Sequence, residues 1–279
     1  MALRINYNLA ASVAQRSLGA SQDNYAKQAE RLATGLRINK AGDDAAGMAV
    51  SERLKNQVRG LNQAARNAQD GISMIQTAEG AMSEAHTILA RMRELAIQAS
   101  NDTVTASDRA NLQVEFSALY SEIDRIATST QFNGTAILTG GSTSLTLQIG
   151  ANSGDTISVN VTPSSGFQPT RLEASFVGAG ASITLQSVAS ATITVLDSAV
   201  NAVSTARASL GAMQSRLESA GRSIAVASEN AAAANSRIAD ADIAGSMSEL
   251  VRAQILQQAG ISVLAQANQA PSLVLQLLK

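Results

Sequence analysis

The fold is decided by residues 54–99, which read LKNQVRGLNQAARNAQDGISMIQTAEGAMSEAHTILARMRELAIQA. Apolar residues recur along this stretch at steps of three and four from Leu54 to Ala99, and every stop in the series is apolar. The one irregularity is a pair of successive three-residue steps between Ile72 and Ala78. This spacing predicts a single long helix with a continuous apolar seam.

A second helix is predicted after a short polar break. Thr105 and Asp108 have the spacing of an N-terminal capping box, with Asp in place of the usual Glu. The apolar row of this helix runs from Leu112 to Ile126. The dipeptide Asn133–Gly134 then predicts a turn.

The middle of the chain changes from helical to strand periodicity. Apolar and polar residues alternate on both sides of a turn sequence at 151–155, which predicts a β-hairpin within 143–162. Residues 163–190 are rich in Ser, Gly and Pro over most of their length, and we expect an exposed connector there. The helical period returns from Leu196 and continues to Ile238.

The predicted fold class is mainly α. Long antiparallel, coiled-coil-like helices come from both chain ends and flank a small central β-hairpin region. Apolar residues make up 45% of the chain but aromatic residues only 3%, so the core must be aliphatic and rich in alanine. Such a core suits long, closely packed helices.

Composition also argues against several classes of function. A net charge of −1 with no basic run gives no electrostatic footprint for nucleic acid or anionic membranes. No apolar stretch approaches the length that spans a membrane, and the N-terminus lacks the apolar centre of a signal peptide, so targeting signals alone indicate a cytoplasmic protein. The chain has no cysteine and one histidine, His86, which argues against disulfides and multi-histidine metal sites. We therefore expect neither an enzyme nor a cofactor.

The chain ends carry thin apolar seams. The C-terminal seam has four large residues, which are Leu256, Val263, Val274 and Leu277. A candidate partner row near the N-terminus has three, which are Leu18, Tyr25 and Leu32. Fully burying each large side chain gives about 1.5–3 kcal/mol, whereas fixing the backbone costs about 1–2 kcal/mol per residue. The ends therefore have too little to bury as one pair, which favours ordering on oligomerisation. Spacing alone fits an ordinary intramolecular coiled coil equally well.

Long stretches at both ends resemble bacterial flagellins. At the N-terminal end these include NLAASVAQRSL and RLATGLRINKAGDDAAGMAVSERL, followed by RMRELAIQASN and TQFNGTAIL. At the C-terminal end SLGAMQSRLESA and RAQILQQAGISVLAQANQAPSLVLQLLK match the family pattern. The resemblance covers about residues 1–161 and 190–279. One departure is ADADIA at 239–244, where the family often has an aromatic residue after the second Asp.

The resemblance implies a structural subunit that polymerises into the flagellar filament. It implies an inner domain of terminal helices, residues 1–42 with 236–279, joined by a spoke near 36–43 to an outer helical domain, 43–235. This looks like a minimal flagellin without large outer variable domains. The implied partners are other copies of the chain, the cap and hook-associated proteins, and an export chaperone. The implied location is the extracellular filament, reached through type III export.

The resemblance also implies particular residues. The assembly seam would include Leu18, Tyr25, Leu32, Leu256, Val263, Ala267, Val274, Leu277 and Leu278. Asp43 and Asp44 are predicted to cap a helix at the spoke. Arg91 and Leu95 are four apart on one helix face, and Glu115 lies on the next helix.

In the family, stretches resembling those around Arg91, Leu95 and Glu115 are recognised by the vertebrate flagellin-sensing Toll-like receptor and make protofilament contacts. Replacing Arg91 and Leu95 by alanine should then leave the helix intact.

Two alternatives stay open from sequence. One is another axial protein, such as the hook–filament junction protein, which shares the terminal helices. The other is a coiled-coil scaffold or adhesin unrelated to flagella.

Overall fold

The computed structural model describes residues 7–139, 144–160 and 182–277, with only the backbone for Ser144 and for 270–277. It divides into two compact units. One comprises Met1–Gln57 with Glu229–Lys279, and the other comprises Val58–Ser228. The long helices α2 (Ala45–Ala99) and α6 (Gln186–Ala239) contribute to both.

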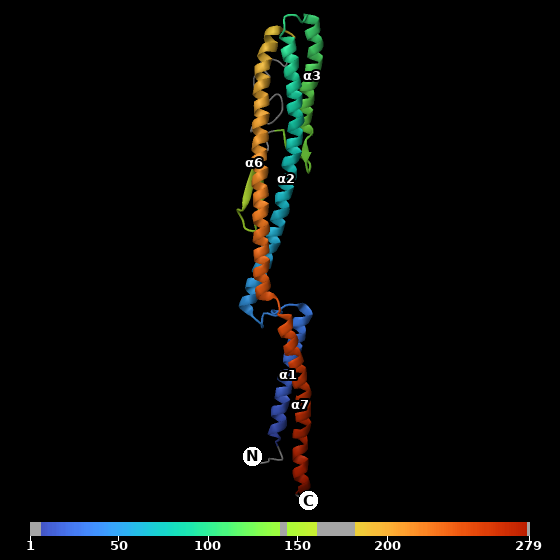
Figure 1. Ribbon diagram of the computed structural model, residues 1–279, viewed down its shortest axis with the longest axis vertical. Helices are drawn as coiled ribbons and strands as arrows, with labels where there is room; N and C mark the ends of the chain where they lie inside the picture. Colours follow the sequence, from blue (N-terminus) through green and yellow to red (C-terminus); the bar gives the residue numbers. More distant parts are fainter. Residues whose placement is uncertain (1–6, 140–143, 161–181, 278–279) are drawn as a thin grey trace. The chain divides into compact units, whose positions relative to one another are not determined.

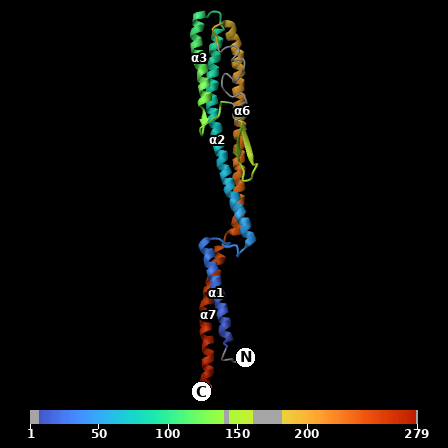
Figure 2. The same ribbon diagram turned by 180° about the vertical axis from the view of Figure 1, so that it is seen from behind.

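The second unit is built on α2, α6 and the shorter helix α3 (Ala106–Ser129), which run alongside one another in Figures 1 and 2. Their apolar rows meet in one continuous core, confirming the mainly α fold class. The largest fully buried side chains on these helices are Ile75, Met82, Leu89, Met92, Leu95, Phe116, Leu196, Leu210 and Leu217. Most of the seam predicted from Leu54 to Ala99 is buried here.

The start of α3 has the predicted cap. The Thr105 hydroxyl accepts the Asp108 backbone N–H at 3.2 Å, and the Asp108 carboxylate accepts the Thr105 N–H at 3.1 Å. Two donors that a helix start leaves unpaired are thereby satisfied. The aspartate thus completes the capping box despite its shorter side chain.

Two short antiparallel hairpins follow α3. Strands β1 (Gln131–Phe132) and β2 (Thr135–Ala136) are joined by Asn133 and Gly134, both with positive φ, as a tight hairpin turn requires. Strands β3 (Ser144–Gln148) and β4 (Thr156–Asn160) lie within the predicted 143–162 hairpin. Alternate residues of β4 are buried, as the alternation predicted.

The hairpin β3–β4 approaches α2 closely at two glycines. A side chain at Gly71 would collide with Leu147, and one at Gly60 would come within 3.1 Å of Ala151. Glycine at these positions lets the hairpin lie against the helix backbone.

The expectation of an exposed connector extending to residue 190 is wrong at its end. Helix α6 begins at Gln186, and Ile183 before it is fully buried in the core. Gln113 on α3 accepts the Ile183 N–H and holds the segment in place. Residues 163–181 lie outside the described part.

Candidate functional site

The first unit is dominated by two terminal helices that lie side by side, α1 (Leu9–Thr34) and α7 (Ile243–Leu277) (Figure 1). The Leu18 side chain lies 3.3 Å from where a Cβ on Gly260 would be, and the Asn8 amide donates to the Ala267 carbonyl at 2.8 Å. Helices can approach this closely where one of them carries a glycine.

The contact face of α1 carries half-buried side chains at steps of three and four: Ala11, Ala14, Leu18, Ser21, Tyr25, Gln28 and Leu32. Other half-buried side chains of α1, such as Ser12, Ala29 and Arg31, lie off this row. Leu18, Tyr25 and Leu32 of the row are residues of the predicted seam, and Leu18 approaches Gly260 of α7.

The contact face of α7 differs from the predicted seam. Its half-buried or buried side chains are Ser246, Leu250, Ala253, Gln257, Gly260, Leu264 and Ala267. Ala267 is on this face, but Leu256 and Val263 are 51% and 54% exposed. Both lie one position away from the contact row and remain uncovered in the single chain. Val274 and Leu277 belong to the stretch described by backbone alone, and Leu278 lies outside the described residues.

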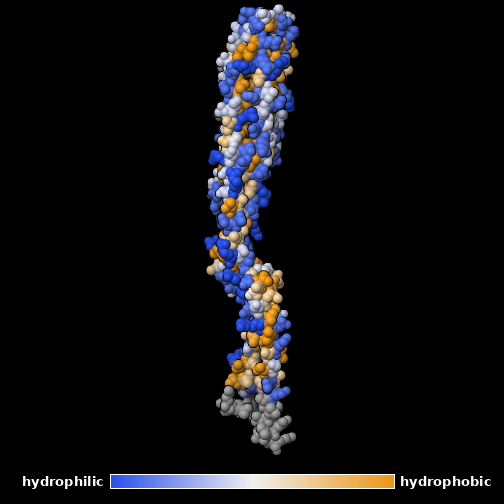
Figure 3. Space-filling model, viewed as in Figure 1, coloured by the Kyte–Doolittle hydropathy of each residue, from blue (hydrophilic) through white to orange (hydrophobic). Residues whose placement is uncertain are grey.

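The contact between α1 and α7 buries little. No side chain of α1 is buried, and among the α7 side chains described, 243–269, only Ala253 is. Meanwhile four large apolar residues at four-residue spacing face solvent on α7: Ile243, Met247, Val251 and Ile255. Apolar side chains gather on the viewed face of this unit in Figure 3. A contiguous uncovered apolar surface of this kind marks an interaction site.

The N-terminal connector, residues 35–44 between α1 and α2, pairs with the segment between α6 and α7. The Arg37 N–H donates to the Ala239 carbonyl at 2.7 Å, and the Ala241 N–H donates to the Gly35 carbonyl at 2.9 Å. These two bonds make an antiparallel bridge between Leu36 and Asp240. Gly35 turns the chain out of α1 with a φ of 71°, which favours glycine.

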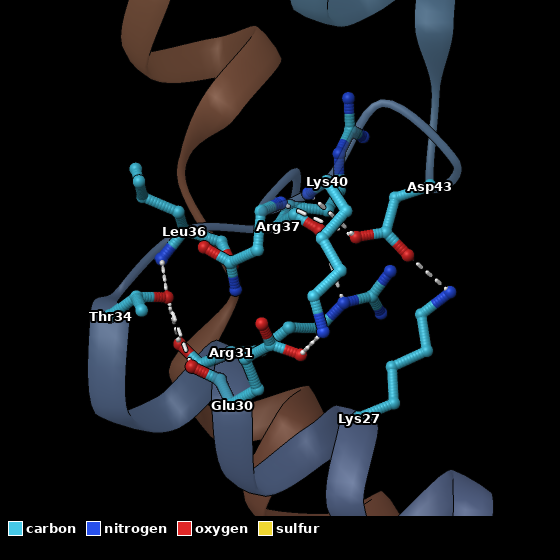
Figure 4. Close-up of polar contacts among 9 residues, drawn as sticks. Lys27, Glu30, Arg31, Thr34, Leu36, Arg37, Lys40 and Asp43 are labelled. Carbon is cyan, nitrogen blue, oxygen red and sulfur yellow. Dashed lines mark hydrogen bonds and ion pairs between the residues drawn. The ribbon is translucent and has the colours of Figure 1, made fainter.

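Charged side chains tie the connector back to α1 (Figure 4). Lys27 pairs with Asp43 at 2.7 Å, and Lys40 pairs with Glu30 at 2.8 Å. The Lys27 ammonium and the backbone N–H groups of Lys40 and Asn39 lower the pKa of Asp43 to about 2, because all of them stabilise its carboxylate. The loop is thus closed by a carboxylate with three donors.

The two aspartates at the start of α2 have different roles. Asp44 accepts the Gly47 N–H at 2.8 Å, the geometry of an N-cap. Asp43 instead accepts the Asn39 and Lys40 N–H groups at 3.3 Å each, so it closes the preceding loop rather than capping the helix.

Arg91 and Glu115 meet between α2 and α3, whereas Leu95 does not join them at the surface. Arg91 donates to Glu115 at 2.9 Å and to Glu94 at 2.9 Å, and both carboxylates raise its pKa. The Leu95 side chain is 1% exposed and belongs to the core. In this conformation it cannot touch a partner, so the expectation of a patch made directly by all three residues is corrected to a surface pair above a buried leucine.

Sequence reasoning did not find Arg37 or the exposed row from Ile243 to Ile255. An arginine at a chain turn has no periodic signal, because its partners are backbone carbonyls 200 residues away. The row could have been found from its four-residue spacing, but α7 has apolar residues on several faces.

Other kinds of site find little support in the described part of the chain. No three His, Cys, Asp or Glu side chains gather there to hold a metal ion. His86 is half-buried on α2. None of the described helices is long and apolar enough to cross a membrane.

Comparison with known proteins places both ends of the chain in one family. Residues 5–143 match the bacterial flagellin N-terminal helical region, and residues 193–278 match the bacterial flagellin C-terminal helical region. A flagellin of Halalkalibacterium halodurans is 48% identical over 278 residues, covering 99% of both chains. The flagellin of Bacillus subtilis is 42% identical, covering 99% of this chain and all of the relative.

Solved structures give the same answer for the fold. The crystal structure of Bacillus cereus flagellin matches 57% of this chain and 88% of its own, with 32% identity and a TM-score of 0.50. A putative flagellar hook-associated protein from Vibrio parahaemolyticus matches 71% of this chain with a TM-score of 0.58. At 13% identity the second match shows a shared fold alone.

Paired terminal helices with uncovered apolar rows, on a chain matched from end to end by filament proteins, define a self-assembling structural subunit. The chain belongs to the bacterial flagellin family. It is a subunit of the flagellar filament, and the hook-associated alternative gains no support from sequence identity.

Proposed function

We propose that copies of this flagellin cover one another's terminal helices when the filament forms. The observation that carries the proposal is where exposed apolar side chains lie. Among the residues whose side chains the structure describes, most of the large exposed apolar ones lie on or just before the two terminal helices: Tyr7, Leu9, Val13, Ile243, Met247, Val251, Ile255, Leu256, Ile261 and Val263. The others in that described part are Ile97, Val114, Leu185 and Val226.

The free energy of burying these exposed side chains favours assembly over a stable pair of α1 and α7 in a single chain. Covering the exposed part of each large side chain is worth on the order of 1 kcal/mol, about half the value for full burial. Summed over one subunit, such gains can offset the entropy of fixing helices that bury almost nothing in the single chain. The terminal helices therefore have their main stabilising contacts in neighbouring copies.

We propose that residues 1–42 and 236–279 form the inner, assembling domain and 43–235 the outer domain. The compact unit that contains both chain ends is somewhat larger, because it extends to Gln57 in α2 and starts at Glu229 in α6. Both divisions put α1, the connector and α7 together, which is the arrangement that the proposal needs.

For Arg91 and Glu115 we propose a surface that serves both protofilament contact and the vertebrate flagellin-sensing Toll-like receptor. The Arg91 side chain is 51% exposed and that of Glu115 is 45% exposed, so both are accessible in the single chain. Leu95 supports this surface from beneath by packing α2 in the core. Arginines of this kind often anchor interfaces.

We further propose type III export as an unfolded chain, with an export chaperone and the cap and hook-associated proteins as partners. The extracellular position of flagellar filaments requires export. The absence of cysteine suits this route, because the chain can form no disulfides on the way.

A matched pair of charge substitutions tests the assembly surface. Ile255→Asp places a carboxylate in the exposed row of α7, and Val226→Asp places one on α6; these side chains are 60% and 57% exposed. Electron microscopy after salt-induced polymerisation should show long filaments for the unaltered protein and for Val226→Asp, but none for Ile255→Asp. Normal filaments from Ile255→Asp would contradict the proposal.

A further inference from the structure

The break between α6 and α7 contains no helix-breaking residue. Helix α6 ends at Ala239 and α7 begins at Ile243, so only 240–242 separate them. Residues 236–244 read SRIADADIA, with neither proline nor glycine. Alanine is the best helix former, and aspartate is a weaker one that still falls well short of a helix breaker. A continuous helix through this stretch is therefore compatible with the residues present.

Interrupting a helix leaves backbone N–H and C=O groups without intrahelical partners, so they need hydrogen-bond partners from elsewhere. At this break the N-terminal connector supplies three such partners. The Arg37 N–H reaches the Ala239 carbonyl, the Arg37 guanidinium reaches the Ile238 carbonyl at 2.7 Å, and the Gly35 carbonyl accepts the Ala241 N–H. The local contribution at the other side is the Asp242 carboxylate, which accepts the Gly245 N–H at 3.2 Å.

Arg37 is the residue on which these contacts converge. Besides its two donors to α6, its own carbonyl accepts the Arg31 Nε–H at 3.1 Å from the last turn of α1 (Figure 4). A positive side chain at a helix C-terminus also interacts favourably with the helix dipole. One residue thus caps α6 and ties that cap to the end of α1.

We propose that the N-terminal connector imposes the break between α6 and α7, with Arg37 as the positioning residue. Without the connector, the Asp242, Ile243 and Ala244 amides bond to carbonyls four residues back, and α6 continues into α7 as one helix. The chain then has two arrangements of the same C-terminal sequence, and the N-terminal segment selects the broken one. Only the consequence for polymerisation rests on the proposed assembly surface.

Arg37→Pro tests the inference because it removes both the N–H and the guanidinium. Ala41→Pro is the matched control: Ala41 occupies the second position of the turn from Lys40 to Asp43, whose 2.9 Å hydrogen bond closes it. Proline is favoured at that position. Arg37→Ala removes the guanidinium alone and separates its effect from that of the backbone.

Amide hydrogen exchange of the full-length monomer gives the readout. We expect exchange at Asp242, Ile243 and Ala244 to slow at least tenfold in Arg37→Pro and to stay unchanged in Ala41→Pro. Loss of structure would make amide exchange faster, so slower exchange distinguishes helix extension from unfolding. Unchanged or faster exchange at these amides in Arg37→Pro would overturn the inference.

A distance measurement keeps the inference testable if the variant loses other contacts. Spin labels on Ala233→Cys and Ser248→Cys would be the only labelled sites, because the chain has no cysteine. In a continuous helix these positions are about 22 Å apart along the axis, from a rise of about 1.5 Å per residue. A narrow distribution near that value in Arg37→Pro alone supports the inference, and the same distribution in the unaltered chain contradicts it.

If assembly requires the broken arrangement, Arg37→Pro should also polymerise poorly. Failure of Ile255→Asp to stop polymerisation would remove the proposed assembly surface but leave the exchange result unaffected. The two ideas can therefore fail separately.

Discussion

At the scale of single residues, the structure places at different depths two side chains that the sequence predicted to share one surface. Arg91 and Leu95 are four positions apart on α2, yet one is at the surface and the other is in the core. Spacing of four residues fixes a shared face but not depth, because α2 packs against α3 and α6 at once and its buried arc is wide. No periodic pattern in one helix reveals how many neighbours it has.

The two residues should therefore respond differently to alanine. Leu95→Ala removes a fully buried side chain and should lower the free energy of unfolding by about 2–5 kcal/mol. Arg91→Ala removes two exposed ion pairs, with Glu94 and Glu115, and should lower the free energy of unfolding far less than Leu95→Ala does. Chemical denaturation of the monomers checks both values. A neutral Leu95→Ala would contradict the burial of this side chain.

Asp43 should titrate far below an ordinary aspartate. Its pKa in the folded loop is about 2, against 3.8 for the free group, so its contribution to stability is complete above about pH 4 and is lost as the pH falls through 2. Carbon NMR of the carboxyl group should give a midpoint near 2 in the unaltered protein. Lys27→Ala removes the ammonium that lowers the pKa of Asp43 most and should raise that midpoint, whereas a midpoint already near 3.8 would show that the loop is open.

At the scale of elements, the sequence predicted helices with one apolar row better than a helix with several. The seams of α2 and α6 were mostly placed correctly because polar residues occupy their other faces, although Ala227 in the α6 row is exposed. In α7, Ile, Val and Leu occur all around the axis. From the sequence alone, the row with Leu256 and Val263 and the row that faces α1 are therefore equally good predictions of the contact face. The partner helix, and not the period, selects the face.

The start of α6 shows another limit. Its first residues, QSVASATITV, are rich in β-branched and hydroxyl side chains, which are weaker helix formers than alanine. The helical period predicted from the sequence began only at Leu196. Burial of Ala189 and Thr192 against the core stabilises this turn by packing. Tertiary contacts thus overrode local propensity.

Two glycines of α2 should respond oppositely to alanine. At Gly71 a Cβ collides with Leu147 of the hairpin, so Gly71→Ala should destabilise the protein by about 1–3 kcal/mol as the hairpin shifts. At Gly80 nothing lies within 4 Å, so Gly80→Ala should stabilise it by about 0.5–1 kcal/mol. Thermal unfolding monitored by circular dichroism compares them. A gain in stability for both variants would contradict close packing of the Leu147 side chain on Gly71.

At the scale of the whole molecule, stability is unevenly distributed between the units. The unit Val58–Ser228 contains the large apolar core, whereas α1 buries no side chain. Regions with few buried apolar contacts open most easily. The terminal helices are thus the part of a single chain with the fewest stabilising buried contacts.

Limited proteolysis should reveal this difference. In a dilute monomer, a protease should remove about residues 1–40 and 240–279 and leave a core near 45–235, whereas the same residues in filaments should resist cleavage. Mass spectrometry of the fragments identifies the boundaries. Equal resistance of ends and core in the monomer would mean that α1 and α7 are stable without neighbours.

The place of Tyr25 on the α1 contact face has an optical consequence. The chain has three tyrosines and no tryptophan, so its ultraviolet fluorescence comes mainly from Tyr7, Tyr25 and Tyr120. Tyr7 precedes α1 and donates its hydroxyl to Ser12 Oγ, Tyr25 lies on α1, and Tyr120 packs against the core from α3. Two of the three natural fluorophores therefore lie near the N-terminal end of the chain, and the ordering of that end during polymerisation can be followed in real time without attaching a dye.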